Sequence, residues 1–505
     1  MSNSGTAQTI GLSEAVRRPT AADHVTVNPS FEDLRAFSRD LERETSFGAP
    51  AYVSEYRSRS AEKTKNANDD EFDDADYDLV ETALDIVDAG DEEFVSVDRT
   101  VGRHPEESYH ARLFVPKQYG RIALGWAKLL EPAEGDDPDF VTVQIPEYDR
   151  TAIRVLPDQG LTVVLGSDYT GEAKKSFLRL FMRRAKEAGG LGLHAGSKRV
   201  RLERDGDLET VGQVFLGLSG TGKSTLTGHG FWLDDPETAE MLQDDVCALR
   251  TDGVVAGSEG RGLYIKTIGL RRDEQPELYD AATRESAVLE NVSVAADGTV
   301  DFDRAEHTTN SRAVIQRETM SSASDDIDLE SIDQVFFITR NPLMPPIAKL
   351  SDEQAAAAFM LGESVQTSAG DPDSAGESIR VVGTNPFIIG SEGAEGNRFH
   401  DLIADLDVDA FVINTGTIGG DAVDIGVEDT VRLLTETARG TVEWREDDEL
   451  EMTVPDDVPG MDVSRFDVPT VVDDFAEKHA ALREERREYL AQFEDLRESI
   501  VDAAY

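Results

Sequence analysis

A glycine-rich segment that ends in Gly-Lys-Ser carries the clearest chemical signal in this sequence. Residues 217–224 read Gly-Leu-Ser-Gly-Thr-Gly-Lys-Ser and match the pattern G-x-x-x-x-G-K-[ST] at every fixed position. Glycines in such a loop let backbone N–H groups converge on phosphate oxygens. In this pattern the lysine reaches the β- and γ-phosphates of a nucleotide, and the hydroxyl residue holds its Mg²⁺. The segment predicts a nucleotide phosphate loop with Lys223 and Ser224 in these two roles.

Three further residues have the types that bind a metal beside such a loop. A phosphate loop needs a downstream acid for its metal, and Asp244 and Asp245 follow it at a suitable distance. In so acidic a chain, an aspartate pair is equally typical of a surface turn. His194 lies between small residues shortly before the loop, which is compatible with a metal ligand and also with a structural histidine.

Lysine is the scarcer base here, so its positions carry information. Only 12 of the 50 basic residues are lysines. Arginine cannot replace lysine where a compact charge or a neutral amine ligand is required. Surface lysines that escaped replacement are the alternative explanation. Four lysines fall in glycine-rich or phosphate-loop contexts: Lys174, Lys175, Lys223 and Lys266.

Apolar patterns predict the elements that must position these residues. Short apolar runs predict buried strands at 161–166, 213–218, 335–339 and 410–414. Ser351-Asp-Glu-Gln354 has capping-box spacing and predicts a helix that continues through Ala355–Ala358. A C-terminal amphipathic helix is predicted by apolar residues at helical spacing, namely Leu482, Tyr489, Phe493, Leu496 and Ile500. Together these elements predict mixed α/β architecture with at least two lobes.

The charge of the chain excludes whole classes of partner. With 101 acidic and 50 basic residues, the formal charge is −51, which excludes a general nucleic-acid binder and disfavours an anionic membrane surface. The chain has one cysteine, so it has no disulfide framework and no cysteine-based zinc site. It lacks a signal peptide and any apolar run of about 20 residues, which predicts a soluble, cytoplasmic protein. Abundant acids with few lysines are typical of proteins from halophiles, which work in concentrated salt.

The order of the motifs resembles that in ATP-dependent phosphoenolpyruvate carboxykinases. The loop spelling Gly-Leu-Ser-Gly-Thr-Gly-Lys is that family's own form, and Tyr-Thr-Gly-Glu-Ala-Lys-Lys at 169–175 is similar to its Y-G-G-E-x-K-K. Further segments that match, in family order between about 100 and about 470, are 289–294, 297–303, 345–350, 414–416 and 455–462. The chain departs from the family at 418–425, which contains no basic residue where the family carries Lys-Arg.

The resemblance implies a two-lobed P-loop fold with mixed sheets and an active site in the cleft between the lobes. It implies ATP, Mg²⁺ and Mn²⁺ as cofactors. The residues implied to be catalytic are Lys174, Lys175, Lys223 and Arg312. Those implied to bind substrate are Arg103, Tyr169, Lys175 and Arg312. Those implied to bind nucleotide are Gly217, Leu218, Ser219, Gly220, Thr221, Gly222, Lys223, Ser224, Thr225 and Lys266. Those implied to bind metal are Lys175, His194, Ser224 and Asp245.

The implied reaction decarboxylates oxaloacetate to an enolate, which takes the γ-phosphoryl group of ATP and leaves phosphoenolpyruvate, CO₂ and ADP. Two alternatives stay open. One is a P-loop kinase of the same scaffold with another acceptor, whose activity would not depend on oxaloacetate. The other is a nucleotide-binding regulator, which would bind ATP without turnover.

The expected organisation has three parts in a monomer or a small homo-oligomer. Residues 1–90 are expected to form an acidic, partly disordered leader. A substrate lobe is expected at 91–205, and a nucleotide-binding lobe at 206–505 that ends in the amphipathic helix.

Overall fold

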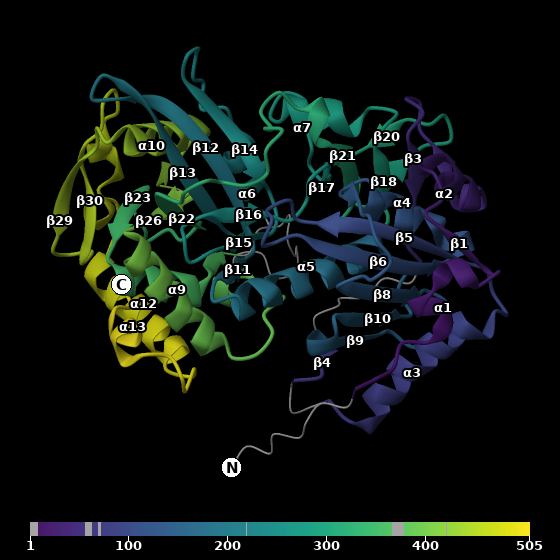
Figure 1. Ribbon diagram of the computed structural model, residues 1–505. Coiled ribbons are helices and arrows are strands. Elements are labelled where there is room, and N and C mark those ends of the chain that lie inside the picture. The colour runs from purple at the N-terminus through teal and green to yellow at the C-terminus, as the bar shows by residue number, and fades with distance from the viewer. Residues whose placement is uncertain (1–8, 56–62, 69–71, 219, 366–377, 421) are drawn as a thin grey trace. The chain divides into compact units, whose positions relative to one another are not determined.

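Two compact units make up the chain in the computed structural model, which describes residues 9–55, 63–68, 72–218, 220–365, 378–420 and 422–505 (Figure 1). Unit 1 comprises Met1–Arg184 and Ser258–Ser321, and unit 2 comprises Ala185–Gly257 and Ser322–Tyr505. The predicted boundaries at 90 and 205 do not coincide with this division. Position 205 is the turn of a hairpin, because Arg204 pairs with Asp207, and the segment after Ser258 returns to pair with an N-terminal strand.

Unit 1 contains a mixed sheet on which one long helix packs. In spatial order its strands are β1 (Val25–Val27), β5 (Phe94–Val101), β6 (Tyr109–Pro116), β8 (Phe140–Ile145), β10 (Leu161–Leu165), β9 (Ala152–Leu156) and β4 (Thr64–Asn66), with β7 (Glu131–Pro132) beside β5. Helix α3 (Asp74–Ala89) buries Leu79, Val80 and Leu84 against β8 and β10. The predicted strand at 161–166 is confirmed as β10.

A second sheet of unit 1 carries several candidate residues. Its order is β17 (Gly262–Lys266), β21 (Arg312–Gln316), β18 (Val288–Glu290), β3 (Pro50–Tyr52) and β2 (Arg43–Glu44). Strands β19 (Ser293–Val294) and β20 (Val300–Asp301) form a separate two-stranded sheet. The other helices that begin in this unit are α1 (Glu14–Arg17), α2 (Phe31–Phe37), α4 (Gly120–Ala127), α5 (Thr170–Glu187) and α7 (Pro276–Ala282).

The acidic run at 69–76 differs from the expected leader where the structure describes it. Residues 69–71 lie outside the described residues, but Asp73 caps α3 by accepting hydrogen bonds from the amides of Ala75 and Asp76. Asp76 completes the capping box and is 3% exposed, and ion pairs with Lys65 and Arg154 compensate the burial of its carboxylate. Aspartates here cap the start of a helix and pair with the cations of Lys65 and Arg154, so the described part of 9–90 belongs to the folded unit.

Replacing Asp73 with alanine should destabilise unit 1 by about 1 kcal/mol, because the first amides of α3 lose their acceptor. Thermal unfolding followed by circular dichroism measures the change. Asp85→Ala is the matched control, since Asp85 lies on the exposed face of the same helix. Equal melting temperatures for the two variants would show that the cap contributes nothing.

Unit 2 is built on a larger mixed sheet with three adjacent parallel strands at its centre. The order is β14 (Thr238–Gln243), β12 (Ala195–Arg204), β13 (Asp207–Leu216), β22 (Gln334–Thr339), β26 (Asp409–Asn414), β23 (Ile347–Leu350), β30 (Met452–Asp457) and β29 (Glu443–Asp447). Strands β13, β22 and β26 run parallel. Apart from the first four residues of β13 and the first residue of β26, they are buried on both faces, as expected of strands covered on both sides. The predicted strands at 213–218, 335–339 and 410–414 are confirmed as these three.

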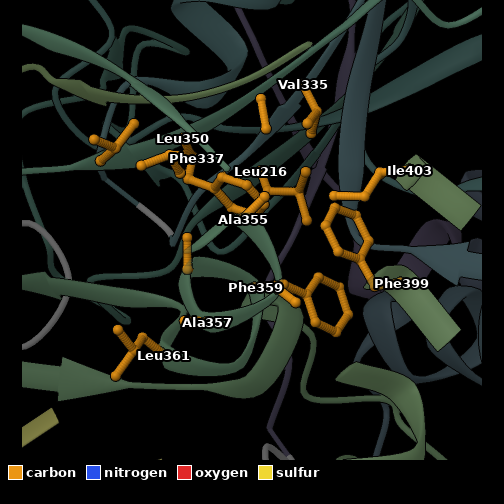
Figure 2. Packing of buried hydrophobic residues seen from close by; sticks show 14 of the residues in the cluster. Leu216, Val335, Phe337, Leu350, Ala355, Ala357, Phe359, Leu361, Phe399 and Ile403 are labelled. Atoms are coloured by element: carbon orange, nitrogen blue, oxygen red, sulfur yellow. The ribbon is translucent and has the colours of Figure 1, made fainter. Parts of the chain in front are cut away.

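Helices cover this sheet and enclose its core. They are α6 (Lys223–Gly228), α8 (Asp352–Leu361), α9 (Glu392–Leu406), α10 (Val427–Arg439), α11 (Val468–Val471), α12 (Phe475–Leu490) and α13 (Glu498–Asp502). The predicted capping box at Ser351 is confirmed at the start of α8. Figure 2 shows Phe359 of α8 beside Phe399 of α9, with ring centroids 4.6 Å apart. Leu216 and Phe337 of the central strands belong to the same cluster.

Small strand groups complete unit 2: β11 (Leu191–Leu193), β15 (Cys247–Leu249) and β16 (Val255–Gly257); β24 (Glu363–Val365) and β25 (Ser378–Arg380); and β27 (Thr417–Ile418) and β28 (Val423–Asp424). Cys247 of β15 is fully buried, and its thiol lies 3.8 Å from the carbonyl oxygen of Ala195.

The predicted C-terminal helix is two helices. Helix α12 ends at Leu490, and α13 begins at Glu498. Between them, Asp495 accepts a hydrogen bond from Ser391 and its carbonyl accepts one from Asn397, which are contacts with the start of α9. These contacts outside the segment favour a turn over continued helix. No helix among the described residues has both the length and the apolarity that a membrane crossing requires.

Candidate active-site residues

The glycine-rich segment forms the connection between β13 and α6, where a phosphate loop must lie. Gly220 and Gly222 have φ values of +87° and +101°, which side chains with a Cβ rarely adopt. Thr221 is 1% exposed and folds the loop on itself, because its hydroxyl donates to the carbonyl of Leu218 over 2.8 Å. Its own carbonyl accepts a 2.7 Å hydrogen bond from Thr415, which follows β26. The predicted Ser219 lies outside the described residues.

The rest of the predicted loop agrees with a site open to a ligand. Gly217 is buried against Ile338 of β22. Lys223 and Thr225 are half-buried and Ser224 is exposed, all three in the first turn of α6.

A buried lysine that the motifs did not single out fastens the far end of α6. Lys198 of β12 is fully buried and donates hydrogen bonds of 2.5 Å to the carbonyls of Leu226 and His229. Its ammonium lies 3.8 Å from the centre of the Phe231 ring. Burial holds the pKa of Lys198 well below its ordinary value. The scarcity of lysine in this chain is the one sequence signal that could have drawn attention to it.

The two aspartates after the loop point to different partners. Asp244 accepts a 3.2 Å hydrogen bond from the hydroxyl of Ser224. Asp245 lies 3.0 Å from Nε2 of His194, measured to its Oδ1. The pair is therefore divided between the phosphate-loop serine and the histidine, which a sequence pattern alone does not specify.

The surroundings of His194 fix which ring nitrogen faces Asp245 as an acceptor. Nδ1 lies 2.5 Å from the carbonyl oxygen of Thr384, and because a carbonyl only accepts, Nδ1 carries the proton. A neutral ring then directs the lone pair of Nε2 at the Asp245 carboxylate. Two acceptors 3.0 Å apart repel each other unless a proton or a cation lies between them. Either a proton or a divalent cation between the two atoms removes this repulsion, and histidine nitrogen with carboxylate oxygen is a donor pair that such a cation accepts.

Thr384 was missed by the sequence reasoning, although its backbone is strained. Its φ is +52°, and that of Gly383 before it is +59°. A β-branched residue is rare in this region, and such strain gathers at functional sites. Here it turns the Thr384 carbonyl toward His194. No sequence pattern marks a backbone carbonyl, so only the folded chain reveals this contact.

Unit 1 brings Tyr169 and Lys175 together at the start of α5. The Lys175 ammonium lies 5.5 Å from the centre of the Tyr169 ring and 3.4 Å from a carboxylate oxygen of Glu172. The adjacent Lys174 is directed elsewhere, since its ammonium forms a buried 2.6 Å ion pair with Glu259. The two neighbouring lysines thus differ in environment, and Lys175 is the more accessible of them.

Arg312 and Lys266 are partners across the β17–β21 ladder. Arg312 donates to Asn310 over 2.8 Å, and Asn310 donates to the Tyr169 hydroxyl over 3.4 Å. The Arg312 guanidinium lies 5.5 Å from the centre of the Tyr264 ring. Burial, and then the nearby charge of Arg312, lowers the pKa of Lys266. These residues form a connected group with Tyr169. The group places the cations of Arg312 and Lys266 beside the rings of Tyr169 and Tyr264.

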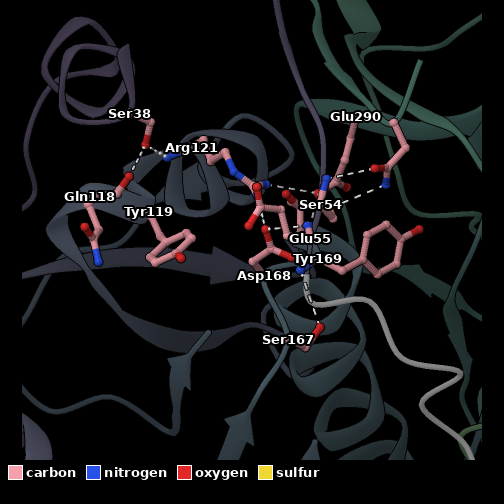
Figure 3. A network of polar contacts seen from close by, with 12 residues as sticks. Ser38, Ser54, Glu55, Gln118, Tyr119, Arg121, Ser167, Asp168, Tyr169 and Glu290 are labelled. Atoms are coloured by element: carbon pink, nitrogen blue, oxygen red, sulfur yellow. Dashed lines mark hydrogen bonds and ion pairs between the residues drawn. The ribbon is translucent and has the colours of Figure 1, made fainter. Parts of the chain in front are cut away.

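A buried ion-pair network positions that group, as Figure 3 shows. Arg121 lies 2.5 Å from a carboxylate oxygen of Asp168 and 3.3 Å from one of Glu290. Glu290 also accepts a 2.9 Å hydrogen bond from the amide of Thr170, the first residue of α5, and one from the hydroxyl of Tyr264. The network therefore ties the start of α5 to β17 and β18, which fixes where Tyr169 lies.

Arg103 occupies another part of unit 1. Its guanidinium donates hydrogen bonds of 2.6 Å to Glu131 and to the carbonyl of Gly260. Gly260 follows Glu259, the partner of Lys174. About a third of the Arg103 side chain, 34%, is exposed. These contacts bring Arg103 near Lys174 of α5, and Glu131 compensates its charge.

Comparisons with known proteins give the family of this chain. A family profile described as Phosphoenolpyruvate carboxykinase matches residues 52–464. The chain is similar to the phosphoenolpyruvate carboxykinase (ATP) of Aeropyrum pernix, at 36% identity over 417 residues, which are 80% of this chain and 83% of that protein. Proteins of the same name from Chelativorans and Rhodopseudomonas palustris are 30% and 33% identical, over 65% and 60% of this chain and 62% and 55% of their own lengths. The chain therefore belongs to the phosphoenolpyruvate carboxykinase family.

Proposed function

We propose that this chain converts oxaloacetate and ATP to phosphoenolpyruvate, CO₂ and ADP. One observation carries the proposal: in a member of this family, the phosphate loop, the divided aspartate pair and His194 occur together in one unit. The cationic group around Arg312 in the other unit supports it. The reaction requires both groups to act on one substrate, and the proposal places them in a cleft between the two lobes.

Residues of unit 2 would bind the nucleotide. The loop amides between Gly217 and Thr225 surround the phosphates, and Lys223 holds the β- and γ-phosphates. Ser224 would hold the Mg²⁺ of the nucleotide, with Asp244 accepting from its hydroxyl and orienting it. Lys198 keeps α6 in place by occupying the carbonyls at its end.

A second cation would be held by His194, Asp245 and Lys175. The facing acceptors of His194 and Asp245 fit such an ion, and histidine as a ligand favours Mn²⁺ over Mg²⁺. When bound, the ion supplies Lewis-acid stabilisation of developing charge on oxygen. Thr384 keeps Nε2 of His194 available, because its carbonyl accepts a hydrogen bond from Nδ1–H.

Residues of unit 1 would hold the substrate and the charge that develops on it. Arg103 would bind the oxaloacetate carboxylate, and Tyr169 would line its pocket. Decarboxylation leaves negative charge on an enolate oxygen, which the cations of Arg312 and Lys175 stabilise. Arg312 then neutralises charge between the enolate and the transferred phosphoryl group. Lys266 would bind the nucleotide.

A coupled assay for phosphoenolpyruvate tests the proposal. Purified protein in concentrated KCl is supplied with oxaloacetate, ATP, Mg²⁺ and Mn²⁺, and Lys223→Ala is the control. Product from the wild type and none from the variant would support the proposed reaction. ATP binding without product would overturn it, and product formation from another acceptor would favour the alternative kinase.

The two aspartates should differ in how they affect Mn²⁺ binding. Without nucleotide, we expect Asp245→Asn and His194→Gln to weaken Mn²⁺ binding by at least about tenfold, since each removes a ligand. Asp244→Asn, the matched control on the adjacent residue, should change it little until ATP is added. Electron paramagnetic resonance of free Mn²⁺ gives the dissociation constants. Equal losses for the two aspartate variants would contradict the division of roles.

A further inference from the structure

Arg340 is a half-buried arginine whose surroundings do not account for its charge. Among the described residues, its buried Nε atom has no hydrogen-bond partner and Arg340 forms no ion pair. The chain has 101 acidic residues against 50 basic ones, so carboxylate partners are abundant. Burial alone lowers the pKa of Arg340, with no carboxylate raising it. Taking a guanidinium out of water without a partner is costly, which points to a missing anion.

The position of Arg340 says which anion this is. It directly follows β22, the strand that lies between β13 and β26 and runs parallel to both. Ligands of such sheets bind beyond the carboxyl ends of the strands. The phosphate loop follows β13, and Thr415 and Gly416 follow β26. Arg340 is therefore at the same edge as the phosphate loop, one strand away.

Close contacts hold this edge together. A Cβ on Gly416 would lie 3.1 Å from the Cβ of Arg340, so the turn after β26 packs directly on the arginine. Thr415 of that turn donates to the phosphate loop at the Thr221 carbonyl over 2.7 Å. Along β22, Phe336 and Ile338 pack in the same cluster as Leu226 of α6. Continuing this alternation places Arg340 on the face of the sheet that carries the phosphate-loop helix.

We infer that Arg340 is a nucleotide-binding residue that contacts the polyphosphate of ATP. The inference rests on the proposed function in taking ATP as the ligand. Arginine suits the role because its planar fork donates two parallel hydrogen bonds to phosphate oxygens. The segment after Gly416, residues 418–425, contains two aspartates and no basic residue, so it supplies no competing cation.

The test measures nucleotide affinity and stability in the same variants. Calorimetric titration of the full chain with MgATP gives the dissociation constant, and thermal unfolding without nucleotide gives Tm. We expect Arg340→Met to weaken MgATP binding by roughly ten- to a hundredfold, as loss of a charge-assisted contact does. Its Tm without nucleotide should equal or exceed that of the wild type, because a buried charge is removed. Arg340→Lys should recover part of the affinity.

Control variants separate this role from others. Arg201→Met removes the same charge from an exposed position of β12 and should leave both quantities unchanged. Inorganic tripolyphosphate is a second probe, and its binding should weaken in Arg340→Met as MgATP binding does. A lower Tm with unchanged MgATP affinity would make Arg340 structural and overturn the inference. Weaker ATP binding with normal tripolyphosphate binding would place the contact on the nucleoside and overturn it too.

The proposed reaction can fail separately from this inference. If the wild type binds MgATP, depends on Lys223 for it and forms no phosphoenolpyruvate, the reaction is wrong while the Arg340 measurement still decides the inference. If phosphoenolpyruvate is formed and Arg340→Met binds MgATP as the wild type does, the reaction stands and the inference fails.

Discussion

Replacing Arg312 with methionine should lower kcat for phosphoenolpyruvate formation by roughly 10³- to 10⁵-fold. This is the contribution of arginines that neutralise the charge of a phosphoryl group during its transfer. Asn310 and the Tyr264 ring hold the Arg312 guanidinium beside Lys266 and Tyr169. The methionine variant would remove an interaction that Arg312 makes with the phosphoryl group only in the transition state. KM should therefore change far less than kcat. Steady-state kinetics with varied oxaloacetate and ATP measure both.

Two further variants make the Arg312 result interpretable. Arg312→Lys keeps the charge and loses the planar fork, so it should recover only part of kcat. Arg271→Met removes an equal charge from an exposed position of unit 1 and should leave kcat unchanged. A loss that appears in KM alone would assign Arg312 to ground-state binding instead of charge neutralisation.

Replacing Arg486 with methionine should destabilise unit 2 by about 3–5 kcal/mol, because it breaks a buried ion pair and leaves a carboxylate behind. Arg486 is 2% exposed, and its guanidinium lies 2.8 Å from Glu363. Arg380 and Asn341 also bind this carboxylate, over 2.9 Å and 2.7 Å. They compensate in part, which places the expected loss toward the lower end of the range.

The same pair makes stability depend on pH in a defined window. Burial would raise the pKa of Glu363, but Arg486 and Arg380 outweigh it and lower the pKa from 4.5 to about 2. A lowered pKa means that the folded state favours the carboxylate. The resulting stabilisation, on the order of 3 kcal/mol, is complete above pH 4.5 and is lost as the pH falls toward 2.

Urea unfolding at pH 7 and at pH 3 measures both effects. Arg483→Met is the matched control on the same helix, because Arg483 pairs with Glu451, whose side chain is 54% exposed. Such a surface pair contributes about 1 kcal/mol or less. If Arg486→Met were no less stable than Arg483→Met, the buried pair would not stabilise the unit. Glutamine does not titrate, so Glu363→Gln should remove most of the decrease in the free energy of unfolding that this pair causes between pH 4.5 and 2.

Local patterns predicted the elements that lie inside the core. The apolar runs at 161–166, 213–218, 335–339 and 410–414 are strands because burial on both faces leaves few alternatives for them. The Ser351 capping box is equally local and equally correct. The C-terminal segment was misread because helical spacing continues past Leu490, whereas the turn at 491–497 depends on contacts with α9. Such contacts between distant segments leave no periodic trace in the sequence.

The candidate site divides in the same way. The glycine-rich loop at 217–224 is one contiguous segment, so spacing alone predicts its residues. The separate contacts of Asp244 and Asp245 depend on Ser224 and His194, which come from other elements of the fold. Thr384, Lys198 and Arg340 reach the site from elements far along the chain. Their contributions depend on a strained carbonyl, a buried ammonium and a parallel strand order, which become visible only in the fold.

The single cysteine, Cys247, can report on local opening of the strands that bury it. Thiolates, not thiols, react with disulfide reagents, and burial raises the pKa of Cys247 to about 12. Closed molecules therefore expose almost no reactive sulfur at neutral pH. Labelling must proceed through rare openings of the strands around β15, so its rate counts those openings directly. No cysteine needs to be introduced or removed, and one modification per chain is the complete signal.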